Sequence, residues 1–384
     1  MTKQKEIFFF MPLLSIGGTE MVHLDVIKAL RVYPIKVFIR YSSNVWKGRE
    51  YSQSTKAKQE GKAMLTEFKE YGPVTFLDRF LEAPRLGRMI KKICIRFLAK
   101  KINRSENPIV IFWHRESIDF LIDKLEPHVK IIDIVHNNSN NDVADPVYLM
   151  NDWVPRIDKR VLISEGLMKW IDPLYKENGY SSAFKDRITV INHCVSFPSE
   201  GIITKNYDKM HVLFIGRDSN EKRFQYFLEI IHELIKDGLP LEIHIVGPDH
   251  ADYPAVKSHQ INWYGTLSNR ALIEQIYRKA HVLVNTSSSE GFPKVIAEAM
   301  AFSCVPIATA VGDVPSQIQI QMNQNGYLTS PANCVSETIT IIKQLNSNPE
   351  ELSRIAENCY LYGIKKFSEE RFKHEWKSVI ESLS

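Results

Sequence analysis

Two glutamates flank a turn in the second half of the chain that could bind an anion. Residues 287–301 read SSSEGFPKVIAEAMA, in which Glu290 precedes the turn and Glu298 stands eight residues further on. Proline suits the first position of a helix, so the sequence predicts a helix that starts near Pro293. Backbone amides at such a helix start point outward, and the helix dipole there favours a phosphate. The residues expected to form this anion site are Gly291, Phe292, Pro293, Lys294 and Val295.

The two carboxylates need an explanation of their own, because they would repel a phosphate. Carboxylates bind sugar hydroxyls well, as charged hydrogen-bond acceptors. A ligand with both phosphate and sugar groups would therefore account for the whole pattern. The alternative is that Glu290 only complements the helix dipole and that Glu298 lies on a solvated helix face. On physical grounds alone, both explanations remain open.

Alternating apolar and amphipathic segments predict the elements that would position this turn. The apolar segments are short and rich in β-branched residues, as in strands that are covered on both faces. Helical periodicity appears between many of them, which predicts parallel sheets with right-handed crossovers. The expected strands are Ile7–Leu13, Ile35–Tyr41, Ile109–Trp113, Lys130–His136, Lys159–Ser164, Ile188–Asn192, His211–Gly216, Leu241–Gly247, Ile261–Gly265, Ala280–Ser287 and Val305–Thr309.

A polar segment in the middle divides this pattern into two halves. Residues 194–210 mix Pro, Ser, Gly and charged residues without helical periodicity, as linkers do. We therefore expect an α/β protein of two doubly wound, Rossmann-like domains with parallel sheets, over residues 1–200 and 205–365. In such folds ligands bind outside the carboxyl ends of the strands, and a cleft between the domains would serve here.

The composition excludes several classes of protein. Charged residues make up 24% and hydrophobic residues 44% of the 384, which argues against disorder or a fibre. Five cysteines, widely spaced and without a C-x-x-C motif, fit neither a disulfide framework nor a zinc site and indicate a reducing compartment. The apolar run 7–16 mimics a signal peptide, but Glu6 and Pro12 favour a buried first strand. No stretch approaches the ~20 apolar residues of a membrane-spanning helix.

The segment around the two glutamates resembles the retaining GT-B glycosyltransferases of family 4, also called glycosyl transferases group 1. The pattern S-x-x-E-G-F-x-x-V-x-x-E-A-M-A carries this resemblance, which is most specific over 263–328 and looser over the whole chain. It implies a GT-B fold whose C-terminal helix, 368–384, packs back on the first domain. In that family the first glutamate contacts the donor sugar and the second holds the ribose of a nucleotide. Those roles fall on Glu290 and Glu298.

Two cations match a second motif of the same family. Residues 215–223, IGRDSNEKR, resemble its G-R-x4-K stretch, so the resemblance implies that Arg217 and Lys222 clamp the donor diphosphate. Arg223 departs from the pattern, which usually has glycine there. Cations suit the reaction because the leaving diphosphate gains charge as the glycosyl bond breaks. No metal motif is evident, so neither a metal nor another cofactor is expected. Without the resemblance, both residues would be read as surface charges at a strand end.

The resemblance also assigns residues of the first domain and the base site. Gly17 and Gly18, in the family's G-G-x-E form, would lie against the donor phosphates and the acceptor. His136 ends an apolar strand and would touch the donor sugar, although a lone histidine is more often structural. His114 is a secondary candidate, structural or on the acceptor side. The residues expected near the nucleotide base are Gly247, Tyr264, which could equally be core, and Gly265.

A basic segment in the first half suggests how an acceptor is reached. Residues 79–104 hold nine basic side chains and one acidic, and apolar residues recur along one helix face. A basic amphipathic helix over 84–104 suits an anionic membrane surface. The alternative is a helix packed on the sheet with a solvated basic face. Nucleic acid is not expected, because no nucleic-acid-binding motif accompanies the charges.

Together these features predict a metal-independent, retaining glycosyltransferase. It would move a hexose or N-acetylhexosamine from a nucleotide-diphosphate sugar to a hydroxyl of a glycan or lipid-linked acceptor, in cell-surface polysaccharide or glycolipid assembly. We expect a cytoplasmic protein, peripheral on the inner face of the membrane. One alternative is a non-catalytic nucleotide-sugar-binding or scaffold protein. A Rossmann-type dehydrogenase would need G-x-G-x-x-G after a strand, where the chain has only Gly17-Gly18.

Overall fold

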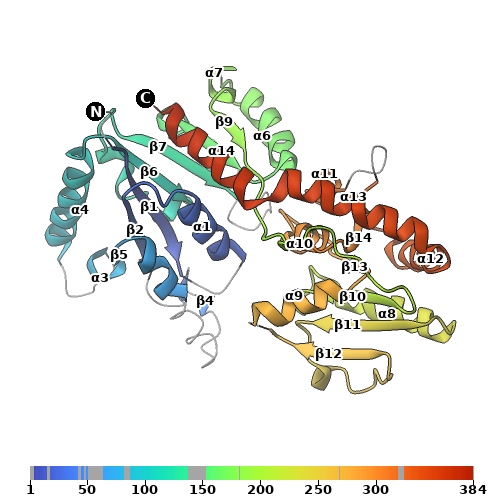
Figure 1. Cartoon of the computed structure of the whole chain (residues 1–384). Helices are drawn as coiled ribbons and strands as arrows, with labels where there is room; N and C mark the ends of the chain where they lie inside the picture. The colour runs from blue at the N-terminus through green and yellow to red at the C-terminus, as the bar shows by residue number, and fades with distance from the viewer. Residues whose placement is uncertain are drawn as a thin grey trace. The chain divides into compact units, whose positions relative to one another are not determined.

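The chain folds into two compact units, which differ in their sheets (Figure 1). The first comprises Met1–Ile191 and Phe372–Ser384, and the second comprises Asn192–Arg371. The computed structural model describes residues 4–14, 18–41, 45–46, 49–50, 64–81, 87–136, 153–180, 182–267, 269–318 and 324–383.

The first unit is built on a seven-stranded parallel sheet in the order β5-β2-β1-β6-β7-β8-β9. Its interior strand β1 is apolar after Glu6, and all residues from Ile7 to Met11 are fully buried, as expected for a strand covered on both faces. The strands of this unit are β1 (Glu6–Leu13), β2 (Ile35–Tyr41), β5 (Val74–Phe76), β6 (Pro108–Trp113), β7 (Lys130–Val135), β8 (Lys159–Leu162) and β9 (Ile188–Val190), with the small antiparallel pair β3 (Val45–Trp46) and β4 (Arg49–Glu50).

Helices cover the faces of this sheet, and one of them comes from the end of the chain. Lys5, just before β1, donates hydrogen bonds of 2.6 Å to the carbonyl oxygens of Ile380 and Leu383. Trp376 is 1% exposed, so the C-terminal helix contributes to a core. The helices of this unit are α1 (Gly18–Ala29), a helix over 64–71, α3 (Asp78–Leu81), α4 (Arg88–Asn103), α6 (Glu165–Glu177), α7 (Ser182–Lys185) and α14 (Glu369–Ser382), with 3-10 turns at Arg115–Ser117, Ile122–Lys124 and Val154–Arg156.

The second unit has a six-stranded parallel sheet in the order β12-β11-β10-β13-β14-β15. The order reverses between β10 and β13, which is the switch point where ligands bind in such sheets. Its elements are β10 (Met210–Ile215), α8 (Phe224–Lys236), β11 (Leu241–Val246), a 3-10 turn (His250–Asp252), β12 (Ile261–Gly265), α9 (Arg270–Lys279), β13 (Val282–Asn285), α10 (Lys294–Ala301), β14 (Val305–Thr309), α11 (Val314–Gln317), β15 (Tyr327–Thr329), α12 (Cys334–Ser347) and α13 (Pro349–Phe367).

The predicted doubly wound parallel α/β architecture is confirmed, and each expected strand is present. The sequence missed β5 and β15, two edge strands of three residues each. Both are too short to form a recognisable apolar run, and their pairing partners, β2 and β14, define them instead. None of the helices in the described part of the chain has the length and apolar character needed to cross a membrane.

Candidate functional site

Loops after the strands of the second unit meet around Lys222 and Glu290. The Nζ of Lys222 lies 2.6 Å from the Oε1 of Glu290, although the two residues are 68 positions apart. The backbone joins the same loops, because the amide of Ser288 donates to the carbonyl of Glu221 at 2.8 Å. The hydroxyl of Thr286 donates to the carbonyl of Lys222 at 2.9 Å. The structure thus brings together the two motifs that the sequence singled out separately.

Glu290 is held firmly from one side. Its Oε1 accepts hydrogen bonds from the Nδ2 of Asn285 at 3.1 Å and from the hydroxyl of Ser287 at 2.6 Å, besides the ion pair with Lys222. The residue is only 8% exposed. Charge-assisted bonds of this kind fix the position of a carboxylate more strongly than neutral ones. Glu290 is therefore an acceptor held in a fixed position, and its role toward a donor sugar stays a prediction.

Two glycines allow the loops to approach each other this closely. Gly312, with φ 53°, lies against the backbone of Glu290, and a Cβ at this position would overlap the Glu290 carbonyl oxygen. Gly247, with φ 115°, lies in the same way against the carbonyl oxygen of Gly216. Only glycine adopts such conformations without strain and without a clash. Gly247, which was expected to lie near a nucleotide base, thus also has a structural role.

The helix after the turn begins one residue later than expected. Pro293 is the N-cap, α10 starts at Lys294, and among the described residues no side chain caps this helix start. Gly291, Lys294 and Val295 are half-buried and lie at the positive end of the helix dipole. Phe292 is 9% exposed and packs edge-on against His193 and Phe367, with centroids 5.1 and 5.6 Å away. Its ring anchors the turn, so a contact with substrate would come from its backbone.

The carboxylate of Glu298 is not solvated, and both of its oxygens already have partners. Its Oε1 pairs with Arg270 at 2.9 Å, and its Oε2 accepts a hydrogen bond from the hydroxyl of Tyr277 at 3.0 Å. Burial, and then the charge of Glu298, raises the pKa of Tyr277 well above its ordinary value, so the phenol stays a donor. Each carboxylate oxygen has a second lone pair, which leaves capacity for a ligand hydroxyl.

The two predicted diphosphate cations differ in their surroundings. The side chain of Arg217 is 81% exposed and pairs with Glu221 at 2.8 Å, whereas that of Lys222 is 21% exposed. Arg217 is thus an exposed surface cation paired with Glu221, and Lys222 is part of the framework of the site.

Arg223 stands where the family pattern usually has glycine, and its backbone adopts a conformation typical of glycine. Its φ of 47° and ψ of 49° lie in the left-handed region. The guanidinium donates to the carbonyl oxygens of Thr286, at 2.5 Å, and Ser287, at 3.0 Å, which lie directly before the Glu290 turn. Its NH2 group also reaches the hydroxyl of Thr309 at 3.3 Å. These bonds offset the strain of a side chain in this conformation.

Tyr264 and Gly265 end the edge strand β12. Gly265 has φ 58°, and its carbonyl accepts a hydrogen bond from the amide of Gly247 at 2.8 Å. The hydroxyl of Tyr264 lies 3.0 Å from the Nδ1 of His244, within the sheet layer. That Tyr264 lies near a nucleotide base stays a prediction. The structure adds its contact with His244.

His136 lies in the first unit at the end of β7, as its position in the sequence indicated. It is 9% exposed, and its Nε2 lies 3.0 Å from the Nε2 of His23, which comes from α1. The ring of Trp113 packs edge-on against it at 5.3 Å. Burial lowers the pKa of His136 to about 3, and burial and His136 together lower the pKa of His23 well below its ordinary value. Both rings are thus neutral at pH 7, which suits hydrogen bonding better than proton donation.

The remaining candidates of the first unit are only partly described. Gly18 is the first residue of α1, and Gly17 lies outside the described residues. His114 is 5% exposed and has φ 67°, an uncommon conformation for a side chain of this size. Its Nδ1 accepts a hydrogen bond from the amide of Glu116 at 3.3 Å, so it caps the turn after β6.

Sequence reasoning missed several partners of the predicted residues. Asn285 and Ser287 precede Glu290 by five and three positions. Polar side chains at the end of a buried strand could have indicated them as partners of Glu290. Arg270 and Tyr277 lie on α9, 28 and 21 positions from Glu298, and no local pattern connects them. His23 is likewise 113 positions from His136.

Comparison with known proteins indicates the class of protein that this chain resembles. Residues 209–348 match the family described as glycosyl transferases group 1. A Campylobacter jejuni protein is 26% identical over 329 residues, which are 81% of this chain and 85% of that protein. Its name is GalNAc-alpha-(1->4)-GalNAc-alpha-(1->3)-diNAcBac-PP-undecaprenol alpha-1,4-N-acetyl-D-galactosaminyltransferase.

Solved structures show the same fold over the full length. A glycosyltransferase from Rickettsia africae has a TM-score of 0.72 at 15% identity, covering 100% of this chain and 99% of that one. HepE from Anabaena, in complex with UDP and glucose, has a TM-score of 0.69 at 14% identity, covering 99% and 100%. The chain therefore has the GT-B fold. The family match and the Campylobacter relative support its assignment as a glycosyltransferase.

Proposed function

We propose that this protein is a retaining, metal-independent family 4 glycosyltransferase that acts in cell-surface polysaccharide or glycolipid assembly. It transfers a hexose or N-acetylhexosamine from a nucleotide-diphosphate sugar to a hydroxyl of a glycan or lipid-linked acceptor. The observation that carries the proposal is the Lys222–Glu290 pair, 2.6 Å apart, beside the uncapped start of α10. A cation, a fixed carboxylate and a helix start meet there at the carboxyl ends of parallel strands.

Each group has a separate part in the proposed transfer. Lys222, Arg217 and the amides at the start of α10 stabilise the diphosphate as it gains negative charge. Glu290 accepts hydrogen bonds from hydroxyls of the donor sugar, and Glu298 accepts them from the ribose. His136, neutral and held by His23, orients the donor sugar. The side chains and the helix dipole supply the positive charge that the leaving group requires, so the reaction needs no metal ion.

The comparisons support the substrate classes in this proposal. The Campylobacter relative is named for transfer of N-acetylgalactosamine to a polyprenol-diphosphate-linked glycan. The HepE structure contains UDP and glucose. We therefore propose a uridine-diphosphate sugar as donor and a lipid-linked glycan as the first acceptor to examine.

A donor screen followed by turnover tests the proposal. The full chain is screened for thermal stabilisation by nucleotide sugars, and the best donor is assayed for transfer with and without EDTA. We expect transfer with retained anomeric configuration, unaffected by EDTA, and a kcat that falls about 10²–10³-fold in Lys222→Met. The matched control is Lys236→Met, an exposed lysine at the end of α8. Inversion of the anomeric centre, or equal turnover in both variants, would contradict the mechanism.

The alternative is a non-catalytic protein that binds nucleotide sugars as part of a glycan-assembly scaffold. Both functions predict donor binding, so binding alone does not separate them. If Glu290→Gln still binds the donor but no longer transfers the sugar, the result supports an enzymatic function. The substitution removes the negative charge of the side chain but keeps its size and shape. Donor binding by the natural chain without transfer or hydrolysis of any donor would favour the scaffold.

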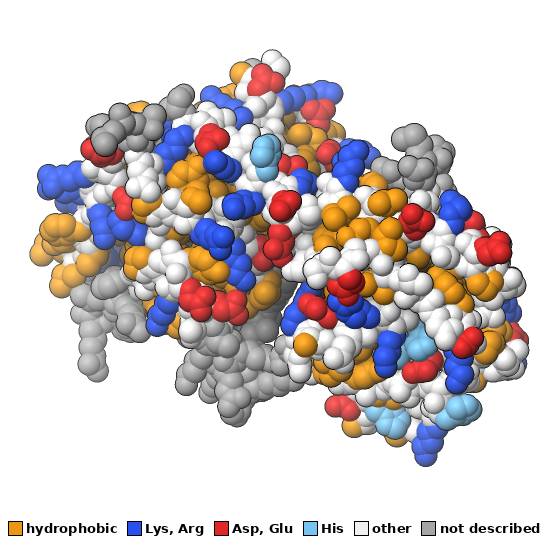
Figure 2. All heavy atoms as spheres, viewed as in Figure 1, with side chains coloured by type: hydrophobic (Ala, Val, Ile, Leu, Met, Phe, Trp, Pro, Cys, Tyr) orange, Lys and Arg blue, Asp and Glu red, His pale blue; other side chains and the backbone are white. Residues whose placement is uncertain are grey.

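We further propose that α4 places the enzyme on an anionic membrane surface. The helix exposes hydrophobic side chains among its basic ones, with Met89 74% and Phe97 67% exposed, and Figure 2 shows the two kinds side by side there. Beneath Phe97 and Cys94 lies an apolar pocket of about 250 Å³. Positive charge beside exposed apolar side chains is complementary to an anionic lipid surface. The basic stretch was expected over 84–104, but the helix begins at Arg88, and residues 84–86 lie outside the described residues.

A further inference from the structure

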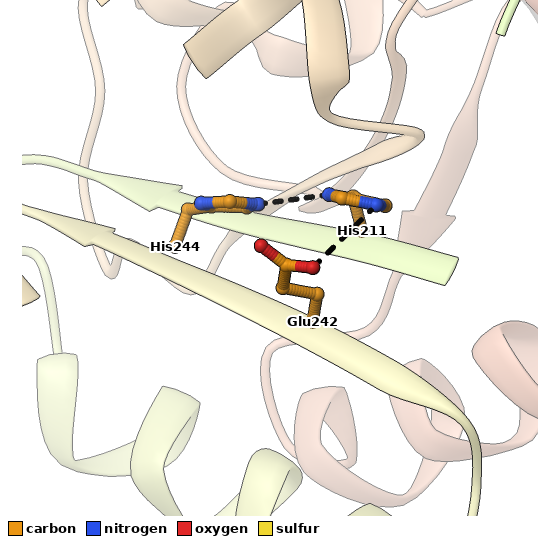
Figure 3. Close-up of side chains that lie close together, drawn as sticks. All are labelled: His211, Glu242 and His244. Atoms are coloured by element: carbon orange, nitrogen blue, oxygen red, sulfur yellow. Dashed lines mark hydrogen bonds and ion pairs between the residues drawn. The ribbon is translucent and has the colours of Figure 1, made fainter. Parts of the chain in front are cut away.

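A second polar cluster lies in the sheet of the second unit, away from the carboxyl ends of the strands. His211 is the second residue of β10, and Glu242 and His244 are the second and fourth residues of β11. The two strands pair in register, with His211 opposite Glu242, so the three side chains share one face of the sheet. Figure 3 shows the carboxylate of Glu242 below the two imidazole rings, which lie end to end.

The donor atoms of this cluster are already close together. The Nδ1 of His211 and the Nε2 of His244 are 3.0 Å apart, and all three potential ligand atoms lie within 4.8 Å of one another. Zinc–nitrogen bonds of about 2.0–2.1 Å at a tetrahedral angle place two nitrogens roughly 3.3–3.4 Å apart. The two nitrogens therefore need to move apart by only a few tenths of an ångström, and the nearly coplanar rings must tilt so that both lone pairs face the ion.

Glu242 can complete such a site by a rotation of its side chain. Its Oε2 is 3.9 Å from the Nε2 of His211, and its Oε1 accepts a long hydrogen bond of 3.4 Å from Asn262. Neither contact is short, and the side chain is 36% exposed, so the carboxylate is free to turn toward the rings.

A neighbouring group orients His244 from behind. The hydroxyl of Tyr264 lies 3.0 Å from the Nδ1 of His244, which leaves the Nε2 of that ring directed at His211. An outer partner of this kind fixes the tautomer and ring orientation of a metal-binding histidine. The backbone amide of His211 donates to the Nδ1 of His281 at 2.9 Å, which holds the strand rather than the ring of His211.

Charged groups of both signs act on the cluster. Lys205, Lys209 and Lys279 act on His211 with a charge that opposes a cation, and the carboxylate of Glu242 acts on it with the opposite sign. A cation bound to the two imidazoles would therefore rely on Glu242 for charge compensation.

We propose that His211, Glu242 and His244 bind one divalent transition-metal ion, preferentially Zn²⁺, with water as the fourth ligand. Two imidazoles and one carboxylate are a ligand set that zinc accepts in tetrahedral geometry. The ion ties β10 to β11 and stabilises the second unit. The three ligands come from the first four residues of β10 and β11, before the strand ends that carry the proposed donor site, and the inference does not depend on the proposed function. Tyr264, which is also expected near the nucleotide base, is a neighbour that the two sites share.

Metal titration of the full chain tests the site. The purified protein is stripped with EDTA, freed of the chelator and titrated calorimetrically with ZnCl₂. We expect one equivalent bound and a higher midpoint of thermal unfolding. Zinc affinity should fall at least tenfold in His211→Asn and Glu242→Gln, and about tenfold in Tyr264→Phe, which removes the outer hydrogen bond. His232→Asn, an exposed histidine on α8, is the matched control and should bind like the natural chain.

A spectroscopic readout separates this site from binding at scattered surface histidines. Co²⁺ in the natural chain should give the intense visible absorption of four-coordinate cobalt, and Zn²⁺ should remove it at one equivalent. Absence of stoichiometric zinc binding by the natural chain would overturn the proposal. So would unchanged affinity in His211→Asn and Glu242→Gln. If either variant fails to fold, the cobalt spectrum and Tyr264→Phe still decide the question.

Discussion

Glu298 shows how the structure adds unexpected partners to a residue that the sequence singled out. The sequence offered a sugar-binding carboxylate or a solvated helix residue. In the structure the carboxylate pairs with Arg270 and Tyr277, and its side chain is only 13% exposed. Its role as a ribose acceptor remains a prediction, and its contacts with α9 now determine how that role is tested.

We expect Glu298→Ala to weaken donor binding by roughly 10- to 150-fold, because hydrogen bonds to charged groups contribute about 1.5–3 kcal/mol. It also leaves the buried hydroxyl of Tyr277 without its acceptor, which should lower the midpoint of thermal unfolding. Glu298→Gln keeps an acceptor for Tyr277 and separates the two effects. Calorimetric titration with UDP and thermal unfolding of both variants provide the measurement. Unchanged UDP affinity in both variants would refute the ribose role.

Arg223 leads to a second prediction at this scale. Arg223→Gly and Arg223→Ala both lose the hydrogen bonds to Thr286 and Ser287, but only alanine retains the left-handed strain. We expect both to be less stable than the natural chain and the glycine variant to be about 1 kcal/mol more stable than the alanine variant. Denaturant unfolding measures the difference. Equal stability of the two variants would show that strain at this residue is not significant.

The loops after the strands, rather than the strands themselves, set the geometry of the candidate site. Gly312→Ala should lower transfer at least tenfold, because its Cβ would displace the backbone of Glu290. Gly238→Ala is the matched control, since Gly238 also has a positive φ, of 71°, but nothing within 4 Å of an added Cβ. Both variants should lose stability, and only Gly312→Ala should lose activity in the donor assay. Equal activities would mean that the close approach does not position Glu290.

Helix α4 can be tested as an element of its own. Lys92→Ala with Arg96→Ala removes two cations, and at about 1 kcal/mol each the affinity for anionic vesicles should fall roughly 30-fold. Phe97→Ser should weaken binding as well, whereas Val32→Ser should not, because Val32 is an exposed apolar residue outside α4. Co-sedimentation with phosphatidylglycerol and phosphatidylcholine vesicles measures both effects. Equal binding to neutral and anionic vesicles would contradict the proposal.

Helix α4 also shows where the sequence prediction needed the structure. The apolar residues were expected to lie roughly along one helix face. In the structure Ile102 is fully buried, while Ile90, Ile93 and Phe97 are 41–67% exposed. Periodicity identifies an amphipathic helix, but which apolar residues reach the core depends on how the helix rests on its sheet. The same holds for the site: Glu290 and Lys222 were recognisable from local motifs, whereas Arg270, Tyr277 and His23 depend on the fold.

At the scale of the whole molecule, the buried histidines make stability depend on pH. His23 and His136 have lowered pKa values in the folded chain, that of His136 falling to about 3, while in the unfolded chain they titrate near 6.5. The unfolded state therefore binds more protons below pH 6.5, and the free energy of unfolding falls as the pH drops toward 3. Each such histidine contributes up to about 1.4 kcal/mol per pH unit.

Thermal unfolding between pH 7.5 and pH 4.5 checks this expectation. The midpoint should decrease with falling pH, and His136→Gln should reduce the slope because it removes one of the buried groups. His128→Gln, an exposed histidine in the same unit, should leave the slope unchanged. The idea would be refuted if His136→Gln and the natural chain lost stability in parallel.

The return of α14 to the first unit has a consequence for biosynthesis. The strand β1 is translated before the second unit, whereas the groups that bond Lys5 and the buried Trp376 are translated after it. The amino-terminal half therefore leaves the ribosome with part of its core surface uncovered, and it stays so while the entire second unit is synthesised. Completion of that core depends on α14, so a chain truncated before α14 should be a substrate for chaperones and proteases, even though its proposed donor site is intact.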